Sequence, residues 1–97
     1  MKRKLEDSIV DARGSTIARV QVEGTDADGY SGNLYFERIP EELANLFSLY
    51  EKYVNDQIFS LVDEVQDKIL SFELRLQNEK KLIQEIQVFG NEVYMRI

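Results

Sequence analysis

The sequence predicts a single α+β domain over residues 1–97, in which an antiparallel sheet of about five strands carries one long amphipathic helix packed across one face. Apolar and polar residues alternate, as in strands, before residue 40 and again after residue 69. Between these regions apolar residues recur at three- and four-residue steps, as in a helix. The length of 97 residues fits one domain with one hydrophobic core.

The first part of the chain predicts two antiparallel strands. Residues 15–23 and 33–39 alternate, with Leu34 and Phe36 expected on one face of the second strand. Residues 8–13 are a further candidate strand that would turn at the following glycine. Residues 24–32 are rich in Gly, Asp and Ser, which favour turns, so a loop of some length is expected between the two strands.

Residues 40–68 predict the helix. Pro40 suits its first position, where no backbone N–H is needed, and Glu41 and Glu42 suit the positive end of the helix dipole. Unbroken, the helix would extend about 42 Å, whereas an ordinary strand reaches only about 27 Å. It therefore overhangs the sheet or bends, and any break is expected at Asn55-Asp56, its weakest helical dipeptide. Its apolar stripe comprises Leu43, Leu46, Phe47, Tyr50, Val54, Ile58, Leu61 and Val65.

The last part of the chain predicts three more strands. Residues 70–76 alternate regularly, residues 77–80 form a turn, and residues 81–89 form the next strand. Gly90-Asn91 then supplies the turn of a hairpin into a final strand that ends at Ile97. The order is thus two or three strands, one helix and three strands, and the pattern does not determine which strands are neighbours.

The composition disfavours catalysis. The chain has no His and no Cys, so it lacks the commonest general base, the commonest metal ligand and a thiol nucleophile. We expect no enzyme, no metal and no cofactor. Residues 26–37 have the length of a calcium-binding loop, but Tyr30 occupies a ligand position and Ser31 stands where the sharp turn requires Gly. The sequence also has no Gly-rich phosphate loop and no nucleophile elbow.

Charge and hydropathy limit the partners and the location. A net charge of −6 argues against unaided binding to nucleic acid or anionic membranes. Basic residues near the N-terminus are followed by Glu6 and Asp7, where a signal peptide would be apolar. No apolar run approaches the roughly 20 residues that span a bilayer. With no Cys to form disulfides, we expect a soluble cytoplasmic protein.

The acidity is concentrated in the predicted helix, where residues 41–68 hold seven acidic and two basic side chains. Phe59 points away from the apolar stripe and should emerge among these carboxylates, unless a bend near Asn55 resets the helical phase and buries it. An exposed Phe beside carboxylates suits an anchor for a protein partner with a basic surface. The candidate partner-binding residues are Phe59, Asp56, Asp63, Asp67 and Gln66.

The alternative is a homo-oligomeric scaffold. The strand faces turned away from the helix carry more large apolar side chains than a wet face needs, and such a patch commonly marks a subunit interface. A two-fold homodimer is the commonest soluble assembly. The candidate dimer-interface residues are Tyr35, Ile39, Ile83, Phe89 and Tyr94.

A third, weaker hypothesis is a small-ligand binder or carboxylate enzyme with a pocket between helix and sheet, lined by Tyr50, Tyr53 and Tyr35. Tyr residues at helical spacing usually belong to the core, which argues against it. The sequence therefore favours a non-enzymatic, acidic protein-binding module. Its specific form would be an inhibitor or immunity-type protein that caps a basic partner.

Overall fold

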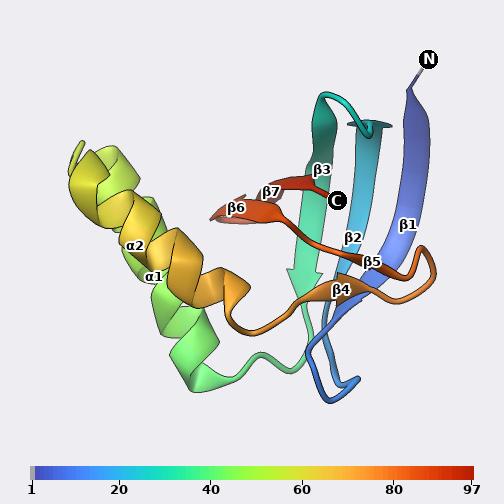
Figure 1. Ribbon diagram of the computed structural model, residues 1–97, viewed down its shortest axis with the longest axis horizontal. Coiled ribbons are helices and arrows are strands. Elements are labelled where there is room, and N and C mark those ends of the chain that lie inside the picture. The colour runs from blue at the N-terminus through green and yellow to red at the C-terminus, as the bar shows by residue number, and fades with distance from the viewer. Residues whose placement is uncertain (1) are drawn as a thin grey trace.

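The computed structural model describes residues 2–97, which form a curled antiparallel sheet of seven strands and two helices (Figure 1). The α+β class and the antiparallel sheet are confirmed, whereas the expected five strands and one long helix are too coarse. The elements in chain order are β1 (Arg3–Val10), β2 (Thr16–Thr25), β3 (Gly29–Phe36), α1 (Glu41–Asn55), α2 (Phe59–Leu70), β4 (Arg75–Leu76), β5 (Lys81–Leu82), β6 (Glu85–Phe89) and β7 (Glu92–Arg96).

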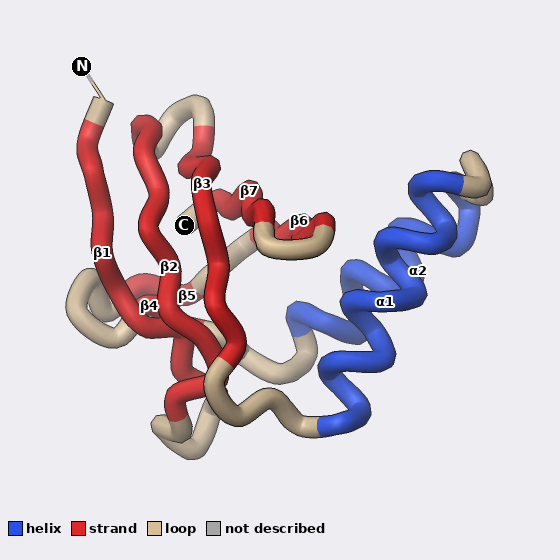
Figure 2. The backbone as a smooth tube through the Cα atoms, turned by 180° about the vertical axis from the view of Figure 1, so that it is seen from behind, coloured by secondary structure: helices blue, strands red, loops and turns tan. Residues whose placement is uncertain are grey.

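The sheet curls into a nearly closed ring. Its strand order is β5-β4-β1-β2-β3-β7-β6, and only Ile83 and Gln84 separate the two outermost strands along the chain. The Ile83 N–H donates to the carbonyl of Leu74 and the Gln84 N–H to the carbonyl of Arg96, both at 2.8 Å. Residues 81–89 therefore pair first with β4 and then with β7. This double pairing brings the ends of the sheet together (Figure 2) and leaves few unpaired edges.

The prediction of a long loop at residues 24–32 is wrong. β2 and β3 pair as far as Thr25 opposite Gly29, which leaves only residues 26–28 for the turn. Gly24 is required inside this hairpin because a Cβ at its position would overlap the carbonyl oxygen of Gly29. Glycines that favour a loop by composition instead permit the close approach of two strands.

The predicted long helix is two antiparallel helices, and the break begins at the expected dipeptide, where α1 ends at Asn55. The Gln57 N–H donates to the carbonyl of Val54 (3.1 Å) and the Ile58 N–H to that of Tyr53 (2.9 Å). These are the two hydrogen bonds of a Schellman motif. Gln57 has the left-handed φ of 58° that this motif requires and that Gly normally supplies. Because the chain reverses there, α2 returns alongside α1 (Figure 1).

The prediction of a strand at residues 70–76 is also wrong. Helix α2 continues to Leu70, a turn with Glu73 at φ 54° follows, and only Arg75–Leu76 pairs in the sheet. Leu74 is nevertheless fully buried. The alternating pattern therefore reports which side chains are buried, and it does not require an extended backbone.

The remaining turns confirm the sequence reading. Residues 77–80 connect β4 to β5, and Gly90, at φ 60°, connects β6 to β7. Of the candidate strand at residues 8–13, only residues 8–10 are extended, as the end of β1, which begins at Arg3; residues 11–13 belong to the turn that includes Gly14 with φ 84°. Two of these three turns use glycine at a positive φ, which is the conformation that its missing side chain allows.

The helices contact the ring at β6 and do not lie across a sheet face, so they project to one side of it (Figures 1 and 2). Only the ends nearer the ring bury side chains in the core, whereas residues 55–60 at the far end are all exposed. No helix within residues 2–97 has the length and apolar character needed to cross a membrane. The core-facing helical residues are Leu43, Leu46, Phe47, Tyr50, Val65 and Ile69.

Asp7 is the only buried charged side chain among the described residues, at 7% exposure. Its Oδ1 accepts hydrogen bonds from the N–H groups of Ser8 (2.7 Å) and Asn78 (2.9 Å), and its Oδ2 accepts from the N–H of Glu79 (3.0 Å). The carboxylate thus joins β1 to the turn at residues 77–80, beyond the short ladder between β1 and β4. These hydrogen bonds hold β1 to the turn beyond the point where the backbone pairing of β1 with β4 ends.

Asp7→Asn should lower the free energy of unfolding by roughly 1.5–3 kcal/mol, the range for hydrogen bonds to a charged group. The amide nitrogen of Asn cannot accept a hydrogen bond from a backbone N–H. Urea unfolding monitored by circular dichroism measures the change. Glu6→Gln removes one charge at the exposed neighbouring position and should change stability by less than about 0.5 kcal/mol. Equal losses in the two variants would mean that net charge, and not this set of hydrogen bonds, is responsible.

Gln57→Gly should raise the free energy of unfolding by about 0.5–1 kcal/mol. Glycine removes the left-handed strain of about 1–2 kcal/mol, part of which is offset by the greater freedom of glycine in the unfolded chain. Thermal and urea unfolding both measure the effect, with Gln57→Ala as the control that keeps the Cβ. A less stable glycine variant would show that contacts of the Gln57 side chain outweigh the strain of its backbone.

Candidate interaction surfaces

The end of the helical pair carries the most exposed large apolar side chain of the described residues. Phe59 is the first residue of α2 and is 62% exposed, and Ile58 beside it is 38% exposed. The reversal at Gln57 changes the helical phase, as the bend hypothesis expected, yet Phe59 is not buried by it. We call residues 55–60 the hairpin tip.

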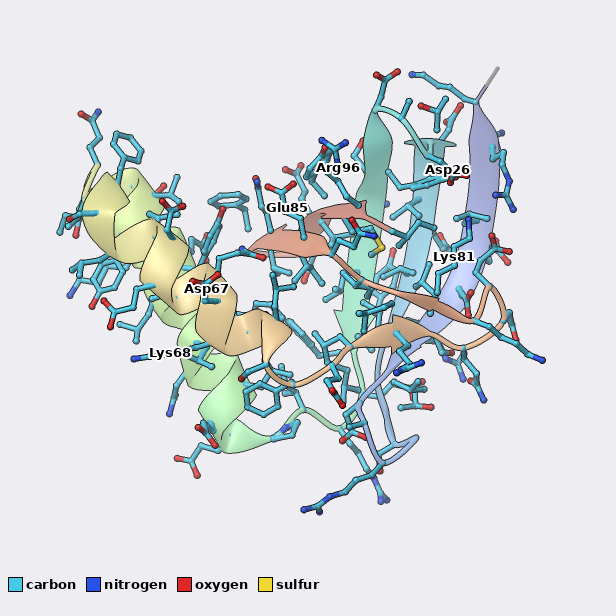
Figure 3. All side chains as sticks on the ribbon, in the orientation of Figure 1. Asp26, Asp67, Lys68, Lys81, Glu85 and Arg96 are labelled. Atoms are coloured by element: carbon cyan, nitrogen blue, oxygen red, sulfur yellow. The ribbon has the colours of Figure 1, made fainter. Side chains whose placement is uncertain are left out.

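Of the three predicted acidic residues, Asp56 lies on the hairpin tip and Asp63 near it, whereas Asp67 lies in the second half of α2. Asp56 caps the end of α1, while Asp63 and Asp67 follow Phe59 on α2 at steps of four residues, and all three are exposed. Lys68 lies next to them and its Nζ is 3.8 Å from the Glu64 carboxylate. Figure 3 shows Asp67 and Lys68 on α2, and Glu85 of β6 lies between them and the more distant Lys81 and Asp26.

Gln66 does not belong to this exposed group. Its Nε2 donates to the carbonyl of Ile86 (2.9 Å) and its Oε1 accepts from the N–H of Ile86 (3.0 Å). The side-chain amide thereby pairs with β6 in the way that a neighbouring strand would. Gln66 is therefore occupied inside the molecule, holding α2 to the ring, and its role as a partner contact is not supported by its position.

The five predicted dimer-interface residues do not form one patch. Ile83 is 2% exposed and lies in the core, which corrects its expected place on an outer face. Ile39 and Phe89 pack against the core, and the Phe89 ring lies 5.9 Å from that of Tyr50. Only Tyr35 is highly exposed, at 52%. The kink between β5 and β6 turns Ile83 inward, which strict alternation along one strand could not predict.

The outer face of the ring over β1, β2 and β3 is polar. The Cα registers of the three strands place Lys4 opposite Glu23 and Glu23 opposite Ser31 in one row, and Gln21 opposite Asn33 in the next. These side chains are all exposed. Apart from Tyr35 this face lacks the apolar area that a stable subunit interface requires.

The three tyrosines of the small-ligand hypothesis are not brought together. Tyr50 is buried and half-buried Tyr53 packs against the core from α1. Tyr35 borders a shallow depression on the outer sheet face with Arg19 and Gln21, and neither Tyr50 nor Tyr53 borders it. Burial raises the pKa of the Tyr50 hydroxyl, and the nearby carboxylates of Glu85 and Asp63 add to that effect. A raised pKa keeps the phenol neutral, which suits a core residue.

The turn at residues 26–28 is held by hydrogen bonds and charge pairs. The hydroxyl of fully buried Tyr30 donates to Asp26 Oδ1 at 2.7 Å, and Lys81 Nζ lies 3.6 Å from Asp26 Oδ2 (Figure 3). The hydrogen bond from Tyr30, aided by the charge of Lys81, holds the pKa of the Asp26 carboxyl below its usual value. The same hydrogen bond and burial raise the pKa of Tyr30. Asp26 therefore serves the fold of this turn.

Within the described part of the chain, no three Asp or Glu side chains come together as a metal site. The turn that had the length of a calcium loop is a tight hairpin turn, with Asp26 engaged by Tyr30. Neither the role of Asp7 nor the contact between Gln66 and β6 was predicted from the sequence. An acidic residue at an inward position of a strand, between Leu5 and Ile9, was the available signal for Asp7.

No family model matches the sequence, no curated protein matches it, and no solved structure matches the fold. What the chain does is therefore argued from its own geometry.

Tyr30→Phe should destabilise the protein at neutral pH, and this loss should shrink as the pH falls. The pKa of Asp26 is depressed in the folded state, so its contribution is present above the unfolded carboxyl pKa of about 3.9 and is lost as the pH falls through the folded pKa. Urea unfolding at about pH 6 and about pH 3 measures the difference between the two proteins.

Tyr94→Phe is the matched control for this experiment. It removes a hydroxyl that donates to the carbonyl of Asp28 (3.0 Å), an acceptor that does not titrate. Its effect on stability should be the same at both pH values. If Tyr30→Phe also showed no pH dependence, the coupling between Tyr30 and the charge of Asp26 would be refuted.

Proposed function

We propose that this chain is a non-catalytic protein-binding module whose hairpin tip contacts a partner with a basic surface. The observation that carries the proposal is the 62% exposure of Phe59 at the end of an acidic helical pair that projects from the ring. Its specific form is an inhibitor or immunity-type protein that caps the basic site of another protein.

The position of Phe59 supports an anchoring role. The exposure of an aromatic side chain to water is unfavourable, and its burial against a partner stabilises the complex. Ile58 enlarges the apolar area and Asp56 and Asp63 border it. A buried aromatic anchor surrounded by polar groups is the usual construction of an energetic hot spot.

The distribution of charge supports a basic partner. Residues 41–70 carry seven acidic and two basic side chains, whereas the rest of the chain carries eleven acidic and ten basic ones. The helical pair therefore holds most of the net charge of −6. Such a concentration of charge accelerates association with an oppositely charged surface, and added salt weakens the effect.

Two further observations support binding without catalysis. The acidic side chains of the helices are exposed to water, apart from half-buried Glu51, whereas catalytic carboxylates usually lie in desolvated clefts. The chain also lacks His and Cys. The absence of Cys supports a cytoplasmic location, which we include in the proposal.

The experiment compares variants of the tagged protein as baits in lysate of its own host, at low and at high salt. Asp63→Asn with Asp67→Asn should slow association with the captured partner about tenfold at low salt and flatten its salt dependence. Phe59→Ala should accelerate dissociation and weaken binding by about 2 kcal/mol or more. Surface plasmon resonance with the identified partner measures both rates.

The matched control is Glu6→Gln with Glu23→Gln, which changes the net charge by the same amount on exposed positions of the ring. It should leave both rates close to those of the unaltered protein. If this pair slowed association as much as the helical pair of substitutions did, the charge of the hairpin would have no special role. A partner that binds Phe59→Ala with unchanged affinity would contradict the anchor.

A further inference from the structure

The edge of β6 that faces the helices has backbone groups available for pairing. Strand β6 pairs with β7 without a register shift, with Ile86 opposite Met95 and Val88 opposite Val93. Both backbone groups of Ile86 bond to Gln66, so they point away from β7. In an antiparallel ladder every second residue points the same way. The N–H and C=O of Val88 therefore also point away from β7, toward the helices.

Ile86 has a partner at this edge, whereas Val88 has none within residues 2–97. No hydrogen bond to the N–H or C=O of Val88 connects it to a turn, a helix or a side chain. The residue is 4% exposed. A buried backbone amide without a partner is rare, because leaving it unpaired costs as much as a lost hydrogen bond. The edge at Val88 is thus an incomplete ladder.

Val88 lines a groove of about 190 Å³ between this edge, the end of β3 and helix α1. Its apolar wall includes Phe36 and Phe47, whose ring centroids are 5.8 Å apart. Ser48 and Glu51 supply the polar groups on α1. We call it the edge groove, and its lining residues are Phe36, Ile39, Ala44, Phe47, Ser48, Glu51, Val88 and Gly90.

The volume of the edge groove limits its occupant. It is smaller than the roughly 300–1,000 Å³ of pockets that enclose a drug-sized ligand, but it can admit one apolar side chain with the peptide unit that carries it. The unpaired N–H and C=O of Val88 require an acceptor and a donor that are presented together. A peptide unit supplies both. The carboxamide of Gln66 supplies both to Ile86, which lies two residues before Val88 in β6.

We propose that the edge groove binds an extended segment of a partner protein, which adds to β6 at Val88 as a short strand. An apolar side chain of that segment packs against Phe36 and Phe47, and a neighbouring Lys or Arg lies near Glu51. The Gln66 carboxamide already makes the two hydrogen bonds of such an addition at Ile86, which shows that this edge accepts an amide in that geometry.

Charge favours this edge over the first half of β1, which is another partly unpaired edge. There Arg3 and Lys4 follow Lys2, and rows of basic side chains block strand addition. The edge groove instead contains Glu51 and lies beside the acidic helices, so a segment with flanking cations is favoured. The inference does not depend on the hairpin tip, because none of the groove residues belongs to it.

The first measurement is amide hydrogen exchange by NMR on the full chain. The Ile86 N–H should exchange slowly and the Val88 N–H at least tenfold faster, since only the former is bonded. Equal protection of the two would mean that the edge at Val88 is already satisfied, and the inference would be refuted.

The second measurement titrates the labelled protein with a blocked pentapeptide that has Val-Leu-Val between two lysines. The amide signals of Val88 and Gly90 should shift. The same peptide methylated on the Leu nitrogen should bind roughly tenfold more weakly, or about 1.4 kcal/mol, and a version with Glu in place of Lys should also bind more weakly. No shift with the lysine peptide, or equal binding of all three, would overturn the proposal.

Variants separate the edge groove from the hairpin tip. Ala44→Leu fills the groove from half-buried Ala44 and should abolish the shifts, while the rest of the NMR spectrum reports that the fold is retained. Phe59→Ala should bind the peptide as the unaltered protein does. Loss of peptide binding in Phe59→Ala with the fold intact would place the peptide at the tip and contradict the groove.

Discussion

The double pairing of residues 81–89 is the constraint on which the rest of the structure depends. One chain segment serves β4 on one side and β7 on the other, so the sheet must curl until its two ends meet. Curling turns alternate side chains of the longer strands toward a common interior, and the bend after β5 sends Ile83 there as well. Without this segment the other five strands would form an open sheet with β4 and β7 at its unpaired edges. Such edges invite association with other chains.

Contacts with the ring in turn fix the position of the helices. Gln66 pairs with Ile86, and the rings of Tyr50 and Phe89 pack together, so each helix has one specific contact with β6. These contacts lie outside the hairpin tip. The base is therefore fixed by burial and hydrogen bonding, while the tip is held only by the packing of the two helices and by the Schellman turn. An exposed apolar tip on a rigid base suits recognition, because little conformational entropy of the chain is lost on binding.

The sequence predicts those features that depend on local patterns. Alternation located β2, helical spacing located α1 and α2, and low helical propensity located the break beside Asn55. It failed where tertiary contacts override composition, as at Gly24, whose role is a close approach of strands. The strand predicted at residues 70–76 failed because burial alone produced the alternation.

The candidate site divides in the same way. The sequence predicted the exposure of Phe59 from the phase of one continuous helix, whereas in the structure Phe59 is exposed because it lies at the far end of the helical pair, where α2 begins. The position of Gln66 depends on which strand lies beside α2, and the inward turn of Ile83 depends on the closure of the ring. Neither strand order nor closure is encoded in a local pattern, because both arise from pairings between segments far apart in the chain.

The two ends of the helical insertion lie close together. Pro40 before α1 and Ser71 after α2 border the same depression, together with Phe72 and the turn after β1. The helical pair thus leaves the ring and returns to it at neighbouring points, so a change in its length need not move the strands on either side. Lineages could lengthen, shorten or recompose its outer turns while the ring and the buried inner turns stay unchanged. New binding specificities could then arise on one inherited framework without the cost of inventing a new fold.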